Sequence, residues 1–382
     1  MTDIRTRVQE AFQAHFGEPP AYLVRAPGRV NLIGEHTDYN AGYVLPMAID
    51  RAVWIAMRPR TDQRVHVHSL DYQESTEFSL ATLQKGKTGW AEYIKGIAWA
   101  MRNKPLEVRG WEGVMAGDIP IGSGLSSSAA LEMASARAFV EASRLEWDPP
   151  SMALLGQKAE NQWVGVQCGI MDQMVSAAAQ RGHALFLDCR SLEYRHIPLP
   201  AQVAICVLDT GTRRGLVDSA YNERRAQCES AAAFFGVKAL RDVTEEAFQA
   251  RGGQLDPLIR RRARHILSEN SRVLQTIQAF ERGDVQAVGQ LLDASHASLR
   301  DDYEVSSPAL DAIVAIAQEL PGCLGARMTG AGFGGCALAL VEDGSAGEFM
   351  QKVAEMYSAQ TGLTPSVYLC YPEEGASLSH AA

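Results

Sequence analysis

Residues 117–132 read Gly-Asp-Ile-Pro-Ile-Gly-Ser-Gly-Leu-Ser-Ser-Ser-Ala-Ala-Leu-Glu, and this stretch decides the fold. Gly122 and Gly124 allow a tight turn and a close approach of the backbone to a ligand. The Ala-rich continuation favours a helix that begins at serines 126–128 and runs to about residue 143. Free N–H groups of a first helical turn attract anions. The pattern therefore fits either a phosphate-binding loop or a helix that is simply capped by serine.

The chain on either side of this stretch predicts an α+β fold with two domains, residues 1–190 and 191–382. Strands are expected at 21–26, 51–58, 64–68, 107–116, 183–188, 202–209 and 364–370, and a strand–loop–strand at 324–341. A Gly- and polar-rich loop is expected from 27 to 42. Helices are expected at 2–16, 90–102, 152–164, 216–235, 256–282, 284–297, 307–319 and 345–358.

Composition excludes several functional classes. The chain has 382 residues, 46% hydrophobic and 21% charged, with a net charge of -9, which argues against nucleic acid as a partner. No apolar run reaches the roughly 18 residues of a membrane span. The seven cysteines are scattered and form no zinc pattern. We expect a cytoplasmic protein without a membrane or nucleic-acid partner, and a monomer.

A cluster of polar residues lies between residues 25 and 40, where Arg29, Glu35, His36 and Asp38 follow one another closely. Carboxylates and a histidine can accept and donate hydrogen bonds in a fixed geometry, which suits the hydroxyls of a sugar. The alternative is a solvated loop whose charges have no task.

Asp172 stands in an otherwise uncharged stretch from Val164 to Ala179. A buried carboxylate needs a hydrogen-bond partner, a cation or a chemical task, and Arg29 and Mg²⁺ are candidates. The alternative is a helix N-cap.

A further glycine loop, Gly330-Ala-Gly-Phe-Gly-Gly335, implies positive φ angles or close backbone approach. It matches G-x-G-x-x-G formally, but the CALALV that follows predicts a strand and not the helix of a dinucleotide site. A plain hairpin is the alternative.

These segments together resemble a known family. PIGSGLSSSAA (120–130) is similar to the phosphate loop of the GHMP small-molecule kinases. APGRVNLIGEHTDYN (26–40) and GVQCGIMDQ (165–173) resemble segments of the galactokinases within that family. The resemblance implies the two-domain GHMP kinase fold, with an N-terminal domain like domain 2 of ribosomal protein S5 and a C-terminal GHMP domain.

The resemblance also implies roles for single residues. Asp172 would be the catalytic base, with Arg29 beside the reacting hydroxyl. Sugar contacts would come from Glu35, His36, Asp38, Gly169, Asp172 and Tyr221. ATP contacts would come from Gly122, Ser123, Gly124, Leu125, Ser126, Ser127, Ser128 and Trp90. Mg²⁺ would be held by Glu160 together with Ser127 or Ser128.

The implied reaction is ATP-dependent phosphorylation of the C1 hydroxyl of galactose, the first committed step of galactose breakdown, with Mg²⁺ as cofactor and ATP as co-substrate. Two alternatives remain open. One is a kinase for a related sugar such as N-acetylgalactosamine or arabinose, and the other is a sensor that binds ATP and galactose without catalysis.

Overall fold

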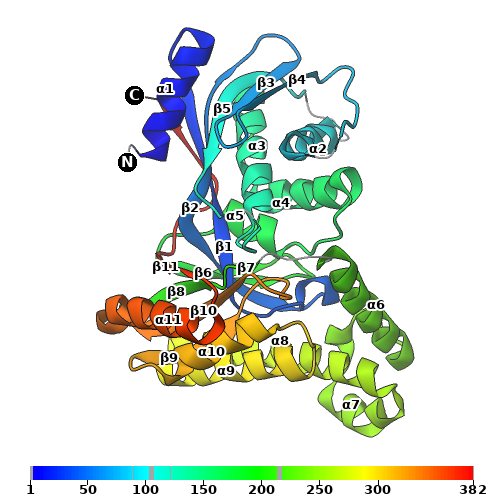
Figure 1. Cartoon of the computed structure of the whole chain (residues 1–382). Coiled ribbons are helices and arrows are strands. Elements are labelled where there is room, and N and C mark those ends of the chain that lie inside the picture. The colour runs from blue at the N-terminus through cyan, green and yellow to red at the C-terminus, as the bar shows by residue number, and fades with distance from the viewer. Residues whose placement is uncertain (1–2, 88, 103–106, 121, 213–216, 382) are drawn as a thin grey trace.

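The computed structural model describes residues 3–87, 89–102, 107–120, 122–212 and 217–381. Two β-sheets form its framework, and helices cover both of them (Figure 1). Residues 2 and 216, where two of the predicted helices begin, lie outside the described part of the chain.

The larger sheet has the strand order β12-β1-β2-β5-β3-β4, and β6 joins it through β2 and carries β7. Its strands pair antiparallel except β3 with β5. Its strands are β1 (Tyr22–Ile33), β2 (Tyr43–Pro59), β3 (Arg64–Ser69), β4 (Glu74–Ser79), β5 (Trp111–Gly117), β6 (His183–Asp188), β7 (Tyr194–Pro198) and β12 (Ser377–His380).

Helices pack on this sheet because they bury apolar faces against it. The small side chains of Ala130 and Ala134 let α3 lie close to β1 and β2 in the main core. A separate small core forms where Val8 and Phe12 of α1 meet the other face of the sheet. The helices of this half are α1 (Ile4–Phe16), α2 (Trp90–Arg102), α3 (Ser127–Ser143), α4 (Pro149–Lys158), a π-helical turn (Ala159–Val164) and α5 (Met171–Ala178).

The smaller sheet has the antiparallel order β11-β8-β10-β9. Its strands are β8 (Val203–Asp209), β9 (Cys323–Met328), β10 (Cys336–Glu342) and β11 (Ser366–Cys370). The helices of this half are α6 (Val217–Phe235), α7 (Glu245–Arg251), α8 (Pro257–Glu281), α9 (Val285–Asp301), α10 (Pro308–Glu319) and α11 (Ala346–Thr361).

The two central strands of this sheet, β8 and β10, are continuous apolar runs because a core packs on each face of the sheet. In β8, Ile205 and Val207 join the main core, which extends from the larger sheet. The alternate residues Cys206 and Leu208 join a second core with the helices of this half. Because one core is built from both sheets, the two halves pack directly on each other.

The α+β class is confirmed, and so is the strand–loop–strand around residues 329–335. The predicted loop from 27 to 42 is wrong over residues 27–33, where β1 continues to Ile33 and pairs with β2. Arg29 and Asn31 are polar, but both are buried and pair with residues of β2. Strands β4, β7 and β12, the first part of β2, and helices α5 and α7 were not predicted.

The end of the chain returns to the first half. Tyr22 in β1 pairs with His380 in β12, and Figure 1 shows both termini beside α1. Strand β7 also joins the larger sheet. The division of the chain into two domains near residue 190 remains a prediction. Strands β7 and β12 follow this point in the sequence but lie in the sheet of the first half.

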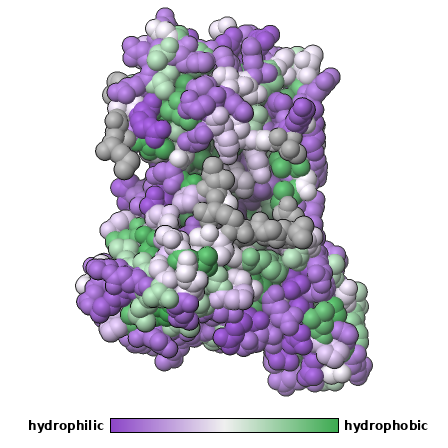
Figure 2. Space-filling model, viewed as in Figure 1, coloured by the Kyte–Doolittle hydropathy of each residue, from purple (hydrophilic) through white to green (hydrophobic). Residues whose placement is uncertain are grey.

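The described helices include none that is both long and apolar enough to cross a bilayer. The face seen in Figure 2 is mostly hydrophilic, with apolar residues in small groups.

Candidate active site

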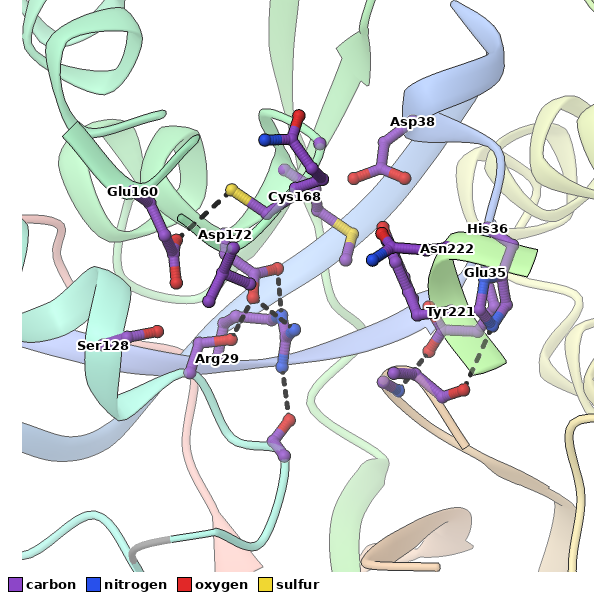
Figure 3. Close-up of a pocket in the computed structure, with 18 of the residues that line it drawn as sticks. Arg29, Glu35, His36, Asp38, Ser128, Glu160, Cys168, Asp172, Tyr221 and Asn222 are labelled. Atoms are coloured by element: carbon purple, nitrogen blue, oxygen red, sulfur yellow. Dashed lines mark hydrogen bonds and ion pairs between the residues drawn. The ribbon is translucent and has the colours of Figure 1, made fainter. Parts of the chain in front are cut away.

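A cavity of about 850 Å³ lies where the two halves meet. It is lined by β1, by the loop after β1, by residues 122–128, by residues 165–172, by α6 and by the loop at 330–331. Figure 3 shows that side chains from these separate segments point toward one another.

Arg29 and Asp172 form the centre of this cavity (Figure 3). Arg29 Nε donates to Asp172 Oδ1 at 2.7 Å, and Nη2 donates to Oδ2 at 2.6 Å. Arg29 Nη1 donates to the carbonyl oxygen of Gly124 at 2.6 Å. The Asp172 side chain keeps 27% of its surface exposed, whereas that of Arg29 keeps 6%. A two-point guanidinium contact fixes the orientation of the carboxylate, which still faces the cavity.

Asp172 is not a helix N-cap. Helix α5 is capped at Ile170, and Asp172 lies in its first turn. Besides Arg29, the hydroxyl of Ser126 donates a hydrogen bond to Oδ2 of Asp172. The capping alternative is therefore wrong, and the pair predicted from sequence, Asp172 with Arg29, is formed.

The loop before α3 is clamped against β1. The N–H of Arg29 donates to the carbonyl of Leu125 at 3.0 Å, and a Cβ atom at Gly28 would lie 2.6 Å from that oxygen. Ser126 has a φ of 61° and makes no capping hydrogen bond with its side chain, so the simple serine-cap alternative is not observed. Helix α3 begins at Ser127, as the sequence predicts.

The predicted ATP contacts divide into two groups. Those that line the cavity are Gly122, Gly124, Ser126, Ser127 and Ser128. Ser123 and Leu125 are buried, and the Ser123 hydroxyl donates to the carbonyl of Pro120. Trp90 is not among the described residues that line this cavity, and its ring stacks on Tyr72 with centroids 6.1 Å apart.

Glu160 lines the cavity together with Ser128 at the start of α3. Its Oε2 accepts from Gln173 Nε2 at 2.7 Å, and that amide donates to Glu132 Oε2 at 3.0 Å. Burial raises the pKa of Glu160 to about 7, and the nearby Asp172 carboxylate adds to this effect. Within the part of the chain that the structure describes, Oε1 of the buried Glu132 has no hydrogen-bond partner.

This excess of buried carboxylate fits a cation beside the loop before α3. Among the described residues, however, no group of three or more His, Cys, Asp or Glu side chains is arranged to hold a metal by itself. A metal here would therefore need ligands from its substrate, as Mg²⁺ bound to phosphate commonly has.

Glu35 is buried on the opposite side of the cavity, at 1% exposure. Its Oε1 accepts from the N–H of Gly330 at 2.7 Å, and its Oε2 accepts from Asn31 Nδ2 at 2.7 Å. The buried Arg327 guanidinium lies 3.6 Å away. Burial raises the pKa of Glu35 in spite of these partners. The Gly330–Gly335 loop therefore holds a residue of the polar cluster, and its glycines 330, 332, 334 and 335 all have positive φ.

His36 is held by protein partners at both ring nitrogens. Nε2 lies 3.2 Å from the carbonyl of Ala331, and Nδ1 lies 2.9 Å from the hydroxyl of Tyr39. Burial lowers the pKa of His36 to about 3, so the ring is neutral. A carbonyl can only accept, so Nε2 carries the proton and Nδ1 accepts from Tyr39. Direct contact of His36 with a sugar remains a prediction.

Asp38 and Gly169 approach each other closely. A Cβ atom at Gly169 would lie 1.7 Å from Asp38 Oδ2, so any side chain here would displace the Asp38 carboxylate. Asp38 Oδ1 accepts from the N–H of Tyr39 at 2.9 Å. Burial and the neighbouring Asp172 raise the pKa of Asp38 to about 7. Two segments far apart in sequence thus bring Asp38 and Asp172 to one cavity.

Tyr221 on α6 completes this side of the cavity, with its ring centroid 5.6 Å from that of His36.

The sequence did not single out Cys168 and Asn222, which also line the cavity. Both are neighbours of residues that it did identify, and no feature of their own marks them as site residues. Cys168 donates its thiol to Glu160 at 3.3 Å.

Three family models match the chain. The galactokinase galactose-binding signature matches residues 10–59, the GHMP kinases N terminal domain matches residues 92–180, and the GHMP kinases C terminal model matches residues 276–359. A galactokinase of Roseiflexus sp. (strain RS-1) is 48% identical over 373 residues, which cover 96% of this chain and 95% of that protein.

Solved structures give the same result. A crystal structure of Lactococcus lactis galactokinase complexed with galactose matches with a TM-score of 0.94 and 36% identity, over 98% of this chain and 100% of that one. A mevalonate kinase of Methanococcus jannaschii matches with a TM-score of 0.61 and 18% identity, over 92% of this chain and 98% of that one, which indicates a shared fold.

Proposed function

Because this chain belongs to the galactokinases of the GHMP kinase family, we propose that its cavity transfers the γ-phosphate of ATP to the C1 hydroxyl of galactose. The observation that carries this proposal is the position of Arg29, which contacts both Asp172 and the loop before α3. The group that would receive a proton and the loop that would hold phosphate are thereby fixed relative to each other.

The ATP side is built from the loop 122–128 and the first turn of α3. Free N–H groups and the helix dipole favour the triphosphate there, and the hydroxyls of Ser127 and Ser128 face the same cavity. Trp90 is proposed to lie near the adenine, in the stack with Tyr72 outside the main cavity.

Glu160 together with Ser127 or Ser128 would hold Mg²⁺, since all three residues line the same cavity. When bound, Mg²⁺ neutralises charge on the phosphates. A carboxyl with a pKa of about 7 is ready to ionise near neutral pH when a cation arrives.

Asp172 is proposed as the base for the C1 hydroxyl. Both of its oxygens are oriented by Arg29, and the side chain lines the cavity with 27% of its surface exposed. It accepts the hydroxyl hydrogen and positions the oxygen for attack, while the Arg29 guanidinium stabilises charge on the transferring group. Phosphoryl transfer depends mainly on such positioning and charge stabilisation.

The sugar hydroxyls are proposed to meet Asp38, the backbone of Gly169, and Tyr221. Asp38 has one protein hydrogen bond in the described contacts, to Oδ1, and lines the cavity. Glu35 and His36 are engaged by the protein and are proposed to shape the same wall. Asp38→Ala is therefore expected to raise the KM for galactose about 10-fold or more and the KM for ATP little.

The decisive experiment measures ADP release in a coupled assay with and without sugar. Galactose is expected to stimulate release, and N-acetylgalactosamine and arabinose to do so much less. Equal or better turnover of either sugar would assign the enzyme to that sugar. ADP release that no sugar stimulates, with galactose still binding, would instead identify a sensor.

We also propose that the protein works in the cytoplasm and as a monomer. All seven cysteines are free, as suits a reducing compartment, and one chain supplies every segment of the cavity. Sedimentation at the concentration of the assay tests whether the protein is a monomer. A dimer that has a higher specific activity than the monomer would contradict this proposal.

A further inference from the structure

Helix α8 presents one face to the polar loop between β1 and β2. His265, Glu269 and Val273 are spaced at four-residue intervals and therefore lie on the same face. A Cβ atom at Gly34 would lie 3.0 Å from Val273 Cγ2, so loop and helix are in close contact. His265 Nε2 lies 3.2 Å from the carbonyl of Glu35.

Glu269 makes the central contact of this face. It is fully buried, and its Oε1 accepts from the N–H of Gly34 at 3.0 Å and from the N–H of Glu35 at 3.4 Å. Ser295 on α9 donates to the same oxygen at 2.7 Å, and Arg272 Nε donates to Oε2 at 2.7 Å. A buried charge is tolerated when it is paired and hydrogen-bonded in this way.

The ionised state of this carboxylate is well supported. Burial alone would raise the pKa of Glu269, but Arg272, and then His265 and Arg327, outweigh it and hold the pKa well below its ordinary value. The Ser295 hydroxyl acts in the same direction.

The two N–H groups that Glu269 binds belong to the residues from which the sugar side is built. The Gly34 backbone has a φ of 103°, which other residues rarely adopt, so this peptide depends on external contacts for its orientation. The Glu35 side chain turns from there to Gly330, and His36 follows with a φ of 64°. The neighbouring Asn270 accepts from the N–H of Tyr43 at 2.8 Å, at the other end of the loop.

We propose that Glu269, held by Arg272, is a positioning residue for galactose. It fixes the Gly34–Glu35 peptide and, through this peptide, the polar loop between β1 and β2 that carries the proposed sugar contacts. This inference rests on the proposed function. Glu269 lies behind the loop, does not line the cavity, and affects the sugar only through the backbone it holds.

The chemistry of glutamine makes Glu269→Gln an informative variant. The amide oxygen can still accept from the two N–H groups, but the amide nitrogen would face Arg272 Nε as a second donor. We expect the KM for galactose to rise about 10-fold and the KM for ATP to stay within about 2-fold. Glu269→Ala should raise the galactose KM further.

A merely structural role predicts a different result. Loss of folded protein lowers the apparent kcat but leaves both KM values unchanged, since KM does not depend on enzyme concentration. Glu281→Gln is the matched control, because Glu281 is on the same helix, exposed, and paired with Arg195 at 3.5 Å. It should leave both KM values unchanged.

Arg272→Met provides a second variant if the Glu269 variants do not fold. It leaves the carboxylate in place and should give the same selective rise in galactose KM, with weaker galactose binding by calorimetry in the absence of nucleotide. Unchanged galactose KM, or an equal rise for galactose and ATP, overturns the inference. Failure of the wild-type enzyme to phosphorylate galactose would instead overturn the proposed function.

Discussion

Gly169→Ala tests the closest approach in the proposed sugar site. A Cβ atom at residue 169 would lie 1.7 Å from Oδ2 of Asp38 and 2.2 Å from its Cγ. Real Cβ contacts are essentially never under 3.0 Å, so the carboxylate must move by roughly 1 Å or more. Gly169 does not have a positive φ, so the methyl group acts through this contact and not through backbone strain.

The size of the effect follows from what Asp38 is proposed to bind. A hydrogen bond to a charged group contributes about 1.5–3 kcal/mol, and its loss would lower kcat/KM for galactose roughly 10- to 100-fold. The three atoms that such a Cβ atom would meet first all belong to Asp38 and none to the loop before α3. The KM for ATP should therefore change by less than about 2-fold.

The assay is steady-state kinetics with each substrate varied at saturation of the other. Gly347→Ala is the matched control, because a Cβ atom there would meet nothing within 4 Å. A Gly169→Ala enzyme with normal kcat/KM for galactose would refute the placement of Asp38 against the sugar, and an equal effect on both substrates would indicate a general disturbance.

Further predictions concern three other groups. Burial and the adjacent Asp172 raise the pKa of Asp38 to about 7. In the wild type, kcat/KM for galactose should therefore rise between pH 6 and 8 as Asp38 ionises, and in the Asp38→Asn variant this rise should be absent. The pKa of Asp38 is higher in the folded protein than in the unfolded chain. Its contribution to the free energy of unfolding is therefore greatest at low pH and is lost as the pH rises through about 7. Urea titrations at a series of pH values measure this loss. Glu160→Gln should raise the Mg²⁺ concentration for half-maximal rate about 10-fold with the galactose KM unchanged, and an unaltered Mg²⁺ requirement would contradict its role. Tyr303→Phe removes a buried hydroxyl 2.7 Å from that of Tyr39 and should lower the free energy of unfolding by roughly 1–2 kcal/mol, measured by denaturant titration; an unchanged value would show that this contact is dispensable.

Much of the fold could be predicted from the sequence, because hydrophobic periodicity and the positions of glycine are local properties of the chain. The Ala-rich helix after Ser126 and the positive φ angles of the Gly330–Gly335 loop follow from residue type alone. Strand β12 could not be predicted, because its short polar sequence is a strand only through its pairing with β1. The same holds for Arg29 and Asn31, which burial by distant segments places within a strand.

The pairing of Arg29 with Asp172 was predicted because an isolated carboxylate needs a partner, and few candidates exist. Glu269 was missed for the opposite reason. It stands in a helix rich in charges, where nothing in the sequence separates a buried glutamate from a solvated one. The occupied ring nitrogens of His36 were also out of reach, because Ala331 and Tyr39 come together only in the fold.

The central claim is that Asp172 serves phosphoryl transfer to galactose and not the binding of nucleotide. Single-turnover conversion of ATP and galactose, compared between wild type and Asp172→Asn with the product identified by NMR, tests it most directly. The account predicts galactose 1-phosphate from the wild type, a rate about 10²- to 10⁴-fold lower in the variant, and ATP affinity within about 2-fold. A variant that transfers phosphate at a near-normal rate would contradict it.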